Sequence, residues 1–215
     1  IFLHYILDLW FEKKLRKEID GYTEIIRYAD DFIIGAQTKI QAEQILNAIK
    51  ERLKKFKLEV SDKKTGIIEF GKYAEENAKK RGKRKSGTFN FLGFTHYCSK
   101  STKGNFLMKV RTEAKRQRIA LKEINVWLKK IRNKVKIKQI WKILSVKLQG
   151  HFNYYGISSN SRSISNYHYQ TVKLVFKWMN RRSQKQSFNW QTFTSYLKLY
   201  PLPKPALAHN MYDIW

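Results

Sequence analysis

The sequence is poor in cysteine and in acidic residues, and it contains no long hydrophobic run. Cys98 is the one cysteine among 215 residues, which excludes a disulfide framework and a multi-cysteine zinc site. We therefore expect a reducing, cytoplasmic location. No apolar run approaches the roughly 20 residues of a membrane-spanning helix, and no signal-peptide pattern is visible, so no membrane partner is expected.

Acidic residues are far outnumbered by basic ones. Lysine and arginine total 44 against 17 aspartates and glutamates, which gives a net charge of +27 and a pI near 10.1. Residues 100–150 carry 16 basic and two acidic side chains, a local balance of +14. A solvated surface and an anionic membrane are alternative interpretations, but aromatic residues interleave with this charge, which favours a nucleic-acid partner.

The first part of the chain has a mixed helix and strand pattern. Apolar spacing predicts a helix over residues 1–19. Because residue 1 is not Met and residues 1–7 read as the inside of an element, we expect the natural protein to continue upstream. β-rich runs predict a tight hairpin around residues 29–31, and a capping box at Thr38 predicts a helix after it. The remaining predictions are strands at 58–60 and 65–70, an exposed basic loop at 71–87, and a hairpin of 95–98 with 106–110.

The later part of the chain is predicted to be all-helical. Apolar stripes predict helices over residues 112–132, from residue 137, over 163–182 and over 188–197. The three prolines all lie in an extended tail after residue 200. The predicted fold class is therefore α+β, with a mixed domain at 1–111, a basic helical domain at 112–200 and a tail at 201–215.

Two adjacent carboxylates mark the first hairpin. Asp30 and Asp31 lie at its tip, behind Tyr28 and the small Ala29. Neighbouring carboxylates on a sharp turn can converge on a hard cation such as Mg²⁺, and a pair of such ions supports nucleotidyl transfer. The alternative is that Asp-Asp simply favours a turn.

Several blocks together resemble the reverse transcriptases encoded by group II introns. Residues 26–32 resemble their catalytic hairpin, and residues 58–65 and 91–94 resemble the next two palm blocks, the second of which includes the primer grip. Residues 148–156 and 178–182 look like the maturase-specific thumb, or domain X. The resemblance covers nearly the whole chain. It implies part of a right-hand polymerase palm followed by a three-helix thumb.

The resemblance also implies an activity and roles for single residues. The activity is RNA-directed DNA polymerisation with dNTPs on an RNA template and a DNA primer, together with intron RNA binding in splicing and mobility. Asp30 and Asp31 would be catalytic Mg²⁺ ligands, Tyr28 would lie beside the primer or template, and Leu92 and Gly93 would contact nucleic acid. Lys64 matches a lysine proposed to donate a proton to the leaving group, although a solvated turn lysine is the alternative.

The basic side chains of the helical domain are expected to follow RNA phosphates. For each one, a solvated surface position is an equal alternative. Tyr154 and Tyr155 could stack on bases, but packing between helices is the favoured interpretation. The predicted nucleic-acid-binding residues here are Lys115, Arg116, Arg118, Lys122, Arg181 and Arg182.

The sequence also departs from the family pattern. The family has a third catalytic Asp on an earlier palm strand, together with fingers and dNTP-binding blocks, and we expect these upstream of residue 1. One cysteine cannot build the family's optional zinc endonuclease domain. The chain alone is not expected to polymerise DNA. The alternative function is a non-catalytic RNA-binding maturase or an inactive remnant.

Overall fold

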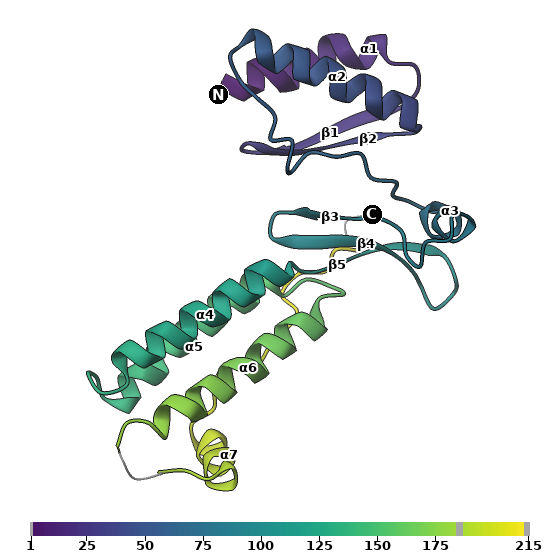
Figure 1. The fold of residues 1–215 in the computed structure, drawn as a ribbon. Helices are drawn as coiled ribbons and strands as arrows, with labels where there is room; N and C mark the ends of the chain where they lie inside the picture. Colours follow the sequence, from purple (N-terminus) through teal and green to yellow (C-terminus); the bar gives the residue numbers. More distant parts are fainter. Residues whose placement is uncertain (1, 184–186, 213–215) are drawn as a thin grey trace. The chain divides into compact units, whose positions relative to one another are not determined.

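The computed structural model describes residues 2–183 and 187–212, and it confirms a mixed helix and sheet fold (Figure 1). The chain divides into two compact units, Ile1–Phe91 and Leu92–Trp215. This division falls before the predicted domain boundary at residue 111. The boundary at 111 concerns palm and thumb function, and it stays a prediction.

The first unit begins with the predicted helix, which contains two π-helical stretches. These are η1 (His4–Asp8) and η2 (Phe11–Leu15), and α1 (Arg16–Glu18) ends the segment. The strands β1 (Thr23–Tyr28) and β2 (Asp31–Ala36) then pair antiparallel, as predicted. The predicted capping box at Thr38 is present and opens α2 (Lys39–Lys55).

The first helical segment (η1, η2 and α1) and α2 cover one face of the hairpin (Figure 1). Their side chains at spacings of three and four form a buried cluster, and alternate residues of the strands pack against it. The hairpin is therefore attached to the core by one face only. The buried members are Ile6, Leu7, Phe11, Leu15, Ile45, Ile49 and Leu53, and the strands add Ile25, Phe32, Ile34 and Ala36.

Two predictions between residues 57 and 87 are wrong. Residues 58–60 and 65–70 are not strands; Leu58 and Val60 instead bury apolar side chains against the core without a ladder partner. The predicted loop at 71–87 contains a short helix, α3 (Ala74–Lys80). Ala74 and Ala78, one helical turn apart, are both buried, which the predominance of basic residues obscured. The unit ends with β3 (Thr88–Phe91).

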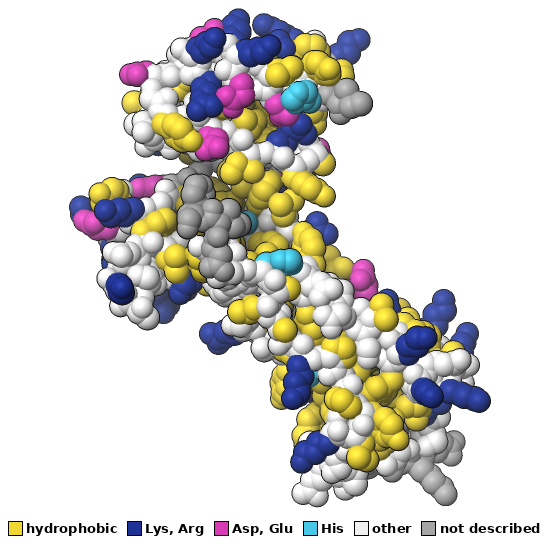
Figure 2. Space-filling view, turned by 180° about the vertical axis from the view of Figure 1, so that it is seen from behind, with side chains coloured by type: hydrophobic (Ala, Val, Ile, Leu, Met, Phe, Trp, Pro, Cys, Tyr) yellow, Lys and Arg dark blue, Asp and Glu magenta, His cyan; other side chains and the backbone are white. Residues whose placement is uncertain are grey.

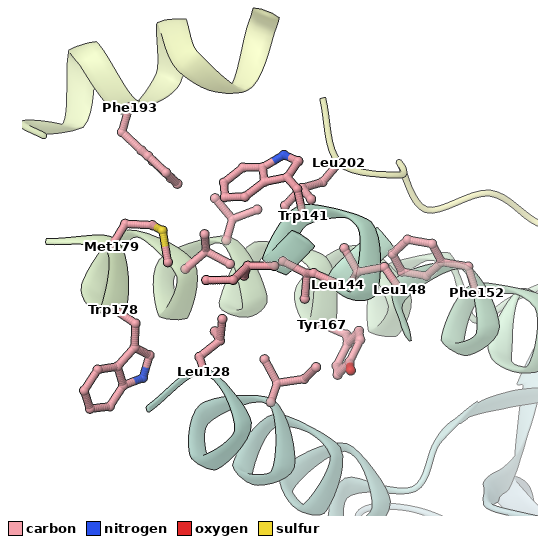
Figure 3. Close-up of a cluster of buried hydrophobic side chains, with 14 of the residues drawn as sticks. Leu128, Trp141, Leu144, Leu148, Phe152, Tyr167, Trp178, Met179, Phe193 and Leu202 are labelled. Carbon is pink, nitrogen blue, oxygen red and sulfur yellow. The ribbon is translucent and has the colours of Figure 1, made fainter. Parts of the chain in front are cut away.

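The second unit begins with the predicted second hairpin, β4 (Phe94–Lys100) and β5 (Phe106–Thr112). Three long helices follow as predicted, and a shorter one precedes the tail. Their bounds are α4 (Ala114–Ile131), α5 (Ile137–Tyr155), α6 (Ser161–Met179) and α7 (Trp190–Leu199). Their apolar stripes meet in one core, to which Phe193 of α7 and Leu202 of the tail also contribute (Figure 3).

A buried polar contact joins the hairpin of the second unit to its helices. Asn160, which is fully buried, accepts a hydrogen bond from the Thr112 amide at 2.8 Å and donates to the Thr112 hydroxyl at 2.9 Å. It also donates to the Tyr155 carbonyl at 2.8 Å. The tail runs back over the same turn, where Ser158 donates its amide to the His209 carbonyl. This network fixes β5 against the start of α6.

Candidate active-site hairpin and nucleic-acid surfaces

The turn of the first hairpin is two residues long. Tyr28 and Asp31 are directly paired, so Ala29 and Asp30 alone connect the strands. Ala29 has a φ of 55°, in the left-handed region that side chains other than glycine seldom adopt. The sequence favours this tight connection because β-rich runs flank a small residue and a turn-forming Asp. The carboxylates are thereby presented at the extreme tip.

The hairpin has an inward and an outward face because side chains alternate along each strand. Ile25, Phe32 and Ile34 face the core. Tyr28 and Asp31 belong to the opposite set, with Ile26, and Tyr28 is 65% exposed. Tyr28 and Asp31 therefore lie on the open face of the hairpin, and Asp30 lies in the turn at its tip.

The two carboxylates fit a cation site by their chemistry. Asp30 and Asp31 are both exposed, and neither forms a salt bridge or a side-chain hydrogen bond within the described residues. Two free, adjacent, hard oxygen donors suit Mg²⁺, which often takes one or two protein carboxylates. Across residues 2–183 and 187–212 no group of three or more His, Cys, Asp or Glu side chains gathers into a fuller metal site. The hairpin therefore supplies two adjacent carboxylates to such a site.

An arginine under the turn connects the tip to the first helix. Arg27 donates from Nε and Nη2 to the two carboxylate oxygens of Asp8, at 2.6 and 2.5 Å. Its Nη1 donates to the Ala29 carbonyl at 2.6 Å. The hydrogen bond from Arg27 lowers the pKa of Asp8, as does a contact with His4, while the Asp8 carboxylate raises the pKa of Arg27. Both partners are therefore held in their charged forms.

Lys64 lies in the same unit, in the tight turn after residue 60. Its amide donates to the Ser61 carbonyl at 2.9 Å, and its side chain is exposed. The neighbouring Asp62 pairs with Lys50 at 2.9 Å, which leaves Lys64 without a salt bridge to a described acid. The predicted role of Lys64 as a proton donor stays a prediction.

In the second unit, the turn at Leu92 and Gly93 is supported by two tyrosines. Both turn residues have positive φ, 50° and 77°. The Tyr154 hydroxyl donates to the Leu92 carbonyl at 2.9 Å, and a Cβ at Gly93 would lie 3.0 Å from the Tyr155 hydroxyl oxygen. Phe94 packs on both rings. The tyrosines thus pack within the protein, although Tyr154 stays half-exposed.

The basic residues predicted to bind nucleic acid in the helical part differ in their exposure and in their contacts within the protein. Lys115, Arg116 and Arg118 are exposed on the first turns of α4, with Arg116 near Glu113 at 3.8 Å. Arg181 is exposed beside the Trp178 ring. Arg182 differs, because it is half-buried and its guanidinium donates to the carbonyls of Arg132 and Val135. Its contacts tie the end of α6 to the loop after α4, so Arg182 has a structural role that the sequence did not indicate.

Lys122 is brought together with two lysines that the sequence reasoning missed. It lines a groove of about 400 Å³ with Lys173 and Lys177 of α6, over a floor of Leu121 and Leu174. Lys173 and Lys177 are four residues apart and so lie on one helical face. This spacing is the sequence feature from which the basic face could have been predicted. Basic side chains stand along the visible surface of the helical part, with few acidic ones (Figure 2). This surface suits a phosphate backbone.

These features indicate a class of protein. Two open carboxylates at a hairpin tip, followed by a strongly basic helical unit, are typical of proteins that act on nucleic acids. Residues 1–96 match the family model described as reverse transcriptase (RNA-dependent DNA polymerase). The match includes the hairpin and supports a reverse transcriptase domain in this part of the chain. A comparison with curated proteins found no match. None of the helices in the described ranges combines the length and apolar character needed to cross a membrane.

Proposed function

We propose that this chain is part of a reverse transcriptase of the group II intron type, which extends a DNA primer on an RNA template with dNTPs. The observation that carries the proposal is the pair of unengaged carboxylates at the exposed hairpin tip, within residues that match the reverse transcriptase family. Asp30 and Asp31 would hold Mg²⁺, which would neutralise charge on the triphosphate and lower the pKa of the attacking hydroxyl.

The chain's own residues have distinct parts in this proposal. Tyr28, exposed beside Asp31, provides a ring against the primer end or a template base. Lys64 supplies positive charge near the leaving pyrophosphate. Leu92 and Gly93 form a stiff turn for the primer strand. The basic helical surface, including Lys115, Arg116, Arg118, Lys122 and Arg181, holds template-primer or intron RNA, which also gives the maturase role.

A second candidate is an RNA-binding maturase without polymerase activity. It is favoured by one specific observation, namely that the described residues bring together only two carboxylates at the hairpin. A polymerase needs further ligands from elsewhere in the complete protein, whereas an RNA-binding role does not.

The test compares primer extension and RNA binding in the complete protein that contains this chain. Asp30→Asn should abolish extension and leave the affinity for structured RNA within about twofold, because the hairpin is not the main source of positive charge. Asp62→Asn is the matched control, since Asp62 is exposed and, among the described residues, forms its salt bridge with Lys50 alone. Extension that survives Asp30→Asn within tenfold would show that Asp30 is not a catalytic metal ligand, whereas a parent protein that binds RNA but extends no primer would leave the RNA-binding candidate.

A further inference from the structure

We infer that Asp8 and Arg27 are a positioning pair that sets the conformation of the catalytic turn and so presents Asp30 and Asp31 to the metal. The inference rests on the proposed function and extends it to two residues that take no part in the chemistry. It starts from the contacts of Arg27, which reaches both the Asp8 carboxylate and the Ala29 carbonyl.

The turn needs outside support because its backbone is strained. A residue other than glycine is strained in the left-handed region, and such conformations persist where the surroundings determine them. Ala29 has a φ of 55°, and no bulky side chain of its own holds it there. The bond from Arg27 Nη1 fixes the carbonyl of this residue, and with it the direction in which the chain enters Asp30.

Arg27 is in turn fixed by a rigid neighbour. Two parallel hydrogen bonds hold its guanidinium on Asp8, a geometry that restricts both rotation and translation. Asp8 ends η1, where Ile6 and Leu7 are buried in the core of the first unit. A continuous set of contacts therefore runs from the core to the carbonyl next to the catalytic carboxylates.

This ion pair differs from the other pairs on the same helix. The side chains of Arg27 and Asp8 are 20% and 24% exposed, and the residues are 19 positions apart. Arg16 and Glu12 form an ordinary pair one helical turn apart, 41% and 44% exposed, at 2.7 Å. An exposed pair within one helix, such as Arg16 and Glu12, contributes little to stability. The pair of Arg27 and Asp8 instead joins β1 to the first helix at the tip of the hairpin.

The expected effect is on metal binding. If the turn is held ready, the carboxylates need no ordering when the cation arrives, and the affinity for the cation is higher. Losing the clamp should therefore raise the Mg²⁺ concentration required for extension. The maximal rate should recover at high Mg²⁺, because Asp30 and Asp31 are still present.

The experiment measures, in the complete protein, Mn²⁺ binding by electron paramagnetic resonance and the rate of primer extension against Mg²⁺ concentration. In each variant of the pair the Mn²⁺ dissociation constant should rise together with the half-maximal Mg²⁺ concentration, because both report on the same carboxylates. Arg27→Gln and Asp8→Asn should each raise the half-maximal Mg²⁺ concentration by about tenfold, roughly the loss of one charged hydrogen bond. The double variant should be no worse than either single one, because both act through one contact. Arg16→Gln, which breaks the matched pair on the same helix, should change nothing.

A conservative variant keeps the test decisive if Arg27→Gln folds poorly. Arg27→Lys retains the charge but cannot make the forked contact, and it should give an intermediate rise in the Mg²⁺ requirement. An unchanged Mg²⁺ requirement, or a rate reduced equally at every Mg²⁺ concentration, would overturn the inference. If Asp30→Asn abolishes extension while Arg27→Gln leaves the Mg²⁺ requirement unchanged, only the positioning role fails. If the parent protein extends no primer, the proposed function itself fails, and if extension survives Asp30→Asn, the assignment of the hairpin as the metal site fails.

Discussion

Replacing Gly93 by alanine offers a quantitative test of the tyrosine-supported turn. Gly93 has a φ of 77°, where any side chain strains the backbone and lowers the free energy of unfolding by on the order of 1–2 kcal/mol. The new Cβ would also lie 3.0 Å from the Tyr155 hydroxyl oxygen. Overpacking of this kind adds roughly 1 kcal/mol or more. Gly93→Ala should therefore reduce the free energy of unfolding by about 2–4 kcal/mol.

Gly104 is the matched control. Its φ is 80°, but an added Cβ would meet nothing within 4 Å. Gly104→Ala should thus lower the free energy of unfolding only through backbone strain, by about 1–2 kcal/mol. Tyr155→Phe removes the crowding atom, and the next ring atoms lie at 3.6 and 3.7 Å, which is ordinary contact distance. In a Tyr155→Phe background, the cost of Gly93→Ala should therefore fall to about that of Gly104→Ala.

Urea unfolding followed by tryptophan fluorescence measures these differences. A Trp10→Phe background removes the one tryptophan of the first unit, so the signal reports on the second unit. Equal destabilisation by the two glycine substitutions would refute the crowding argument. So would a Gly93→Ala cost that Tyr155→Phe leaves unchanged.

Three further predictions concern the second unit. Asn160→Ala should lower the free energy of unfolding by about 2–4 kcal/mol, because it leaves the buried Thr112 amide without its partner and removes the hydrogen bonds that Asn160 donates to the Thr112 hydroxyl and the Tyr155 carbonyl. Asn153→Ala on the surface should lower it by under about 0.5 kcal/mol in the same urea titration. Burial lowers the pKa of His151 to about 4, so below about pH 6.5 the unfolded chain binds the proton more readily than the folded one. The free energy of unfolding should therefore fall as the pH drops from about 6.5 towards 4. His151→Phe should remove this part of the pH dependence of the urea midpoint. Ending the chain after Tyr200 removes the buried Leu202 and should cost about 2–4 kcal/mol, seen as a lower thermal midpoint; an unchanged midpoint would show that the tail contributes nothing.

Local patterns were sufficient for much of the fold. The hairpin of β1 and β2 follows from two β-rich runs around a two-residue turn, and α2 follows from its capping box and apolar spacing. The core of the helical part follows from stripes such as Ile140, Leu144 and Leu148. In each case the signal is contained within one element, where period and capping are decisive.

The predictions failed where the partner is distant in sequence. Residues 58–60 alternate between apolar and polar side chains as a strand does. Their apolar side chains instead pack against the core of the first unit, and their backbone is not part of a β-sheet. The basic residues after Gly71 obscured the two buried alanines of α3. For the site, no local pattern connects Asp8 with Arg27, or Lys122 with Lys173 across the groove. Such pairings depend on tertiary packing, which a single sequence does not encode locally.

The most direct test of the central claim is a change of metal specificity at Asp31. In the complete protein, Asp31→Cys replaces a hard oxygen ligand by a soft sulfur, which binds Mg²⁺ poorly and Cd²⁺ or Mn²⁺ better. The parent protein serves as the control for Cys98, which is buried. If Asp31 is a metal ligand, primer extension should be lost with Mg²⁺ and partly restored when Mn²⁺ or Cd²⁺ is added. Extension that persists with Mg²⁺ alone would contradict the assignment of this hairpin as the metal-binding centre.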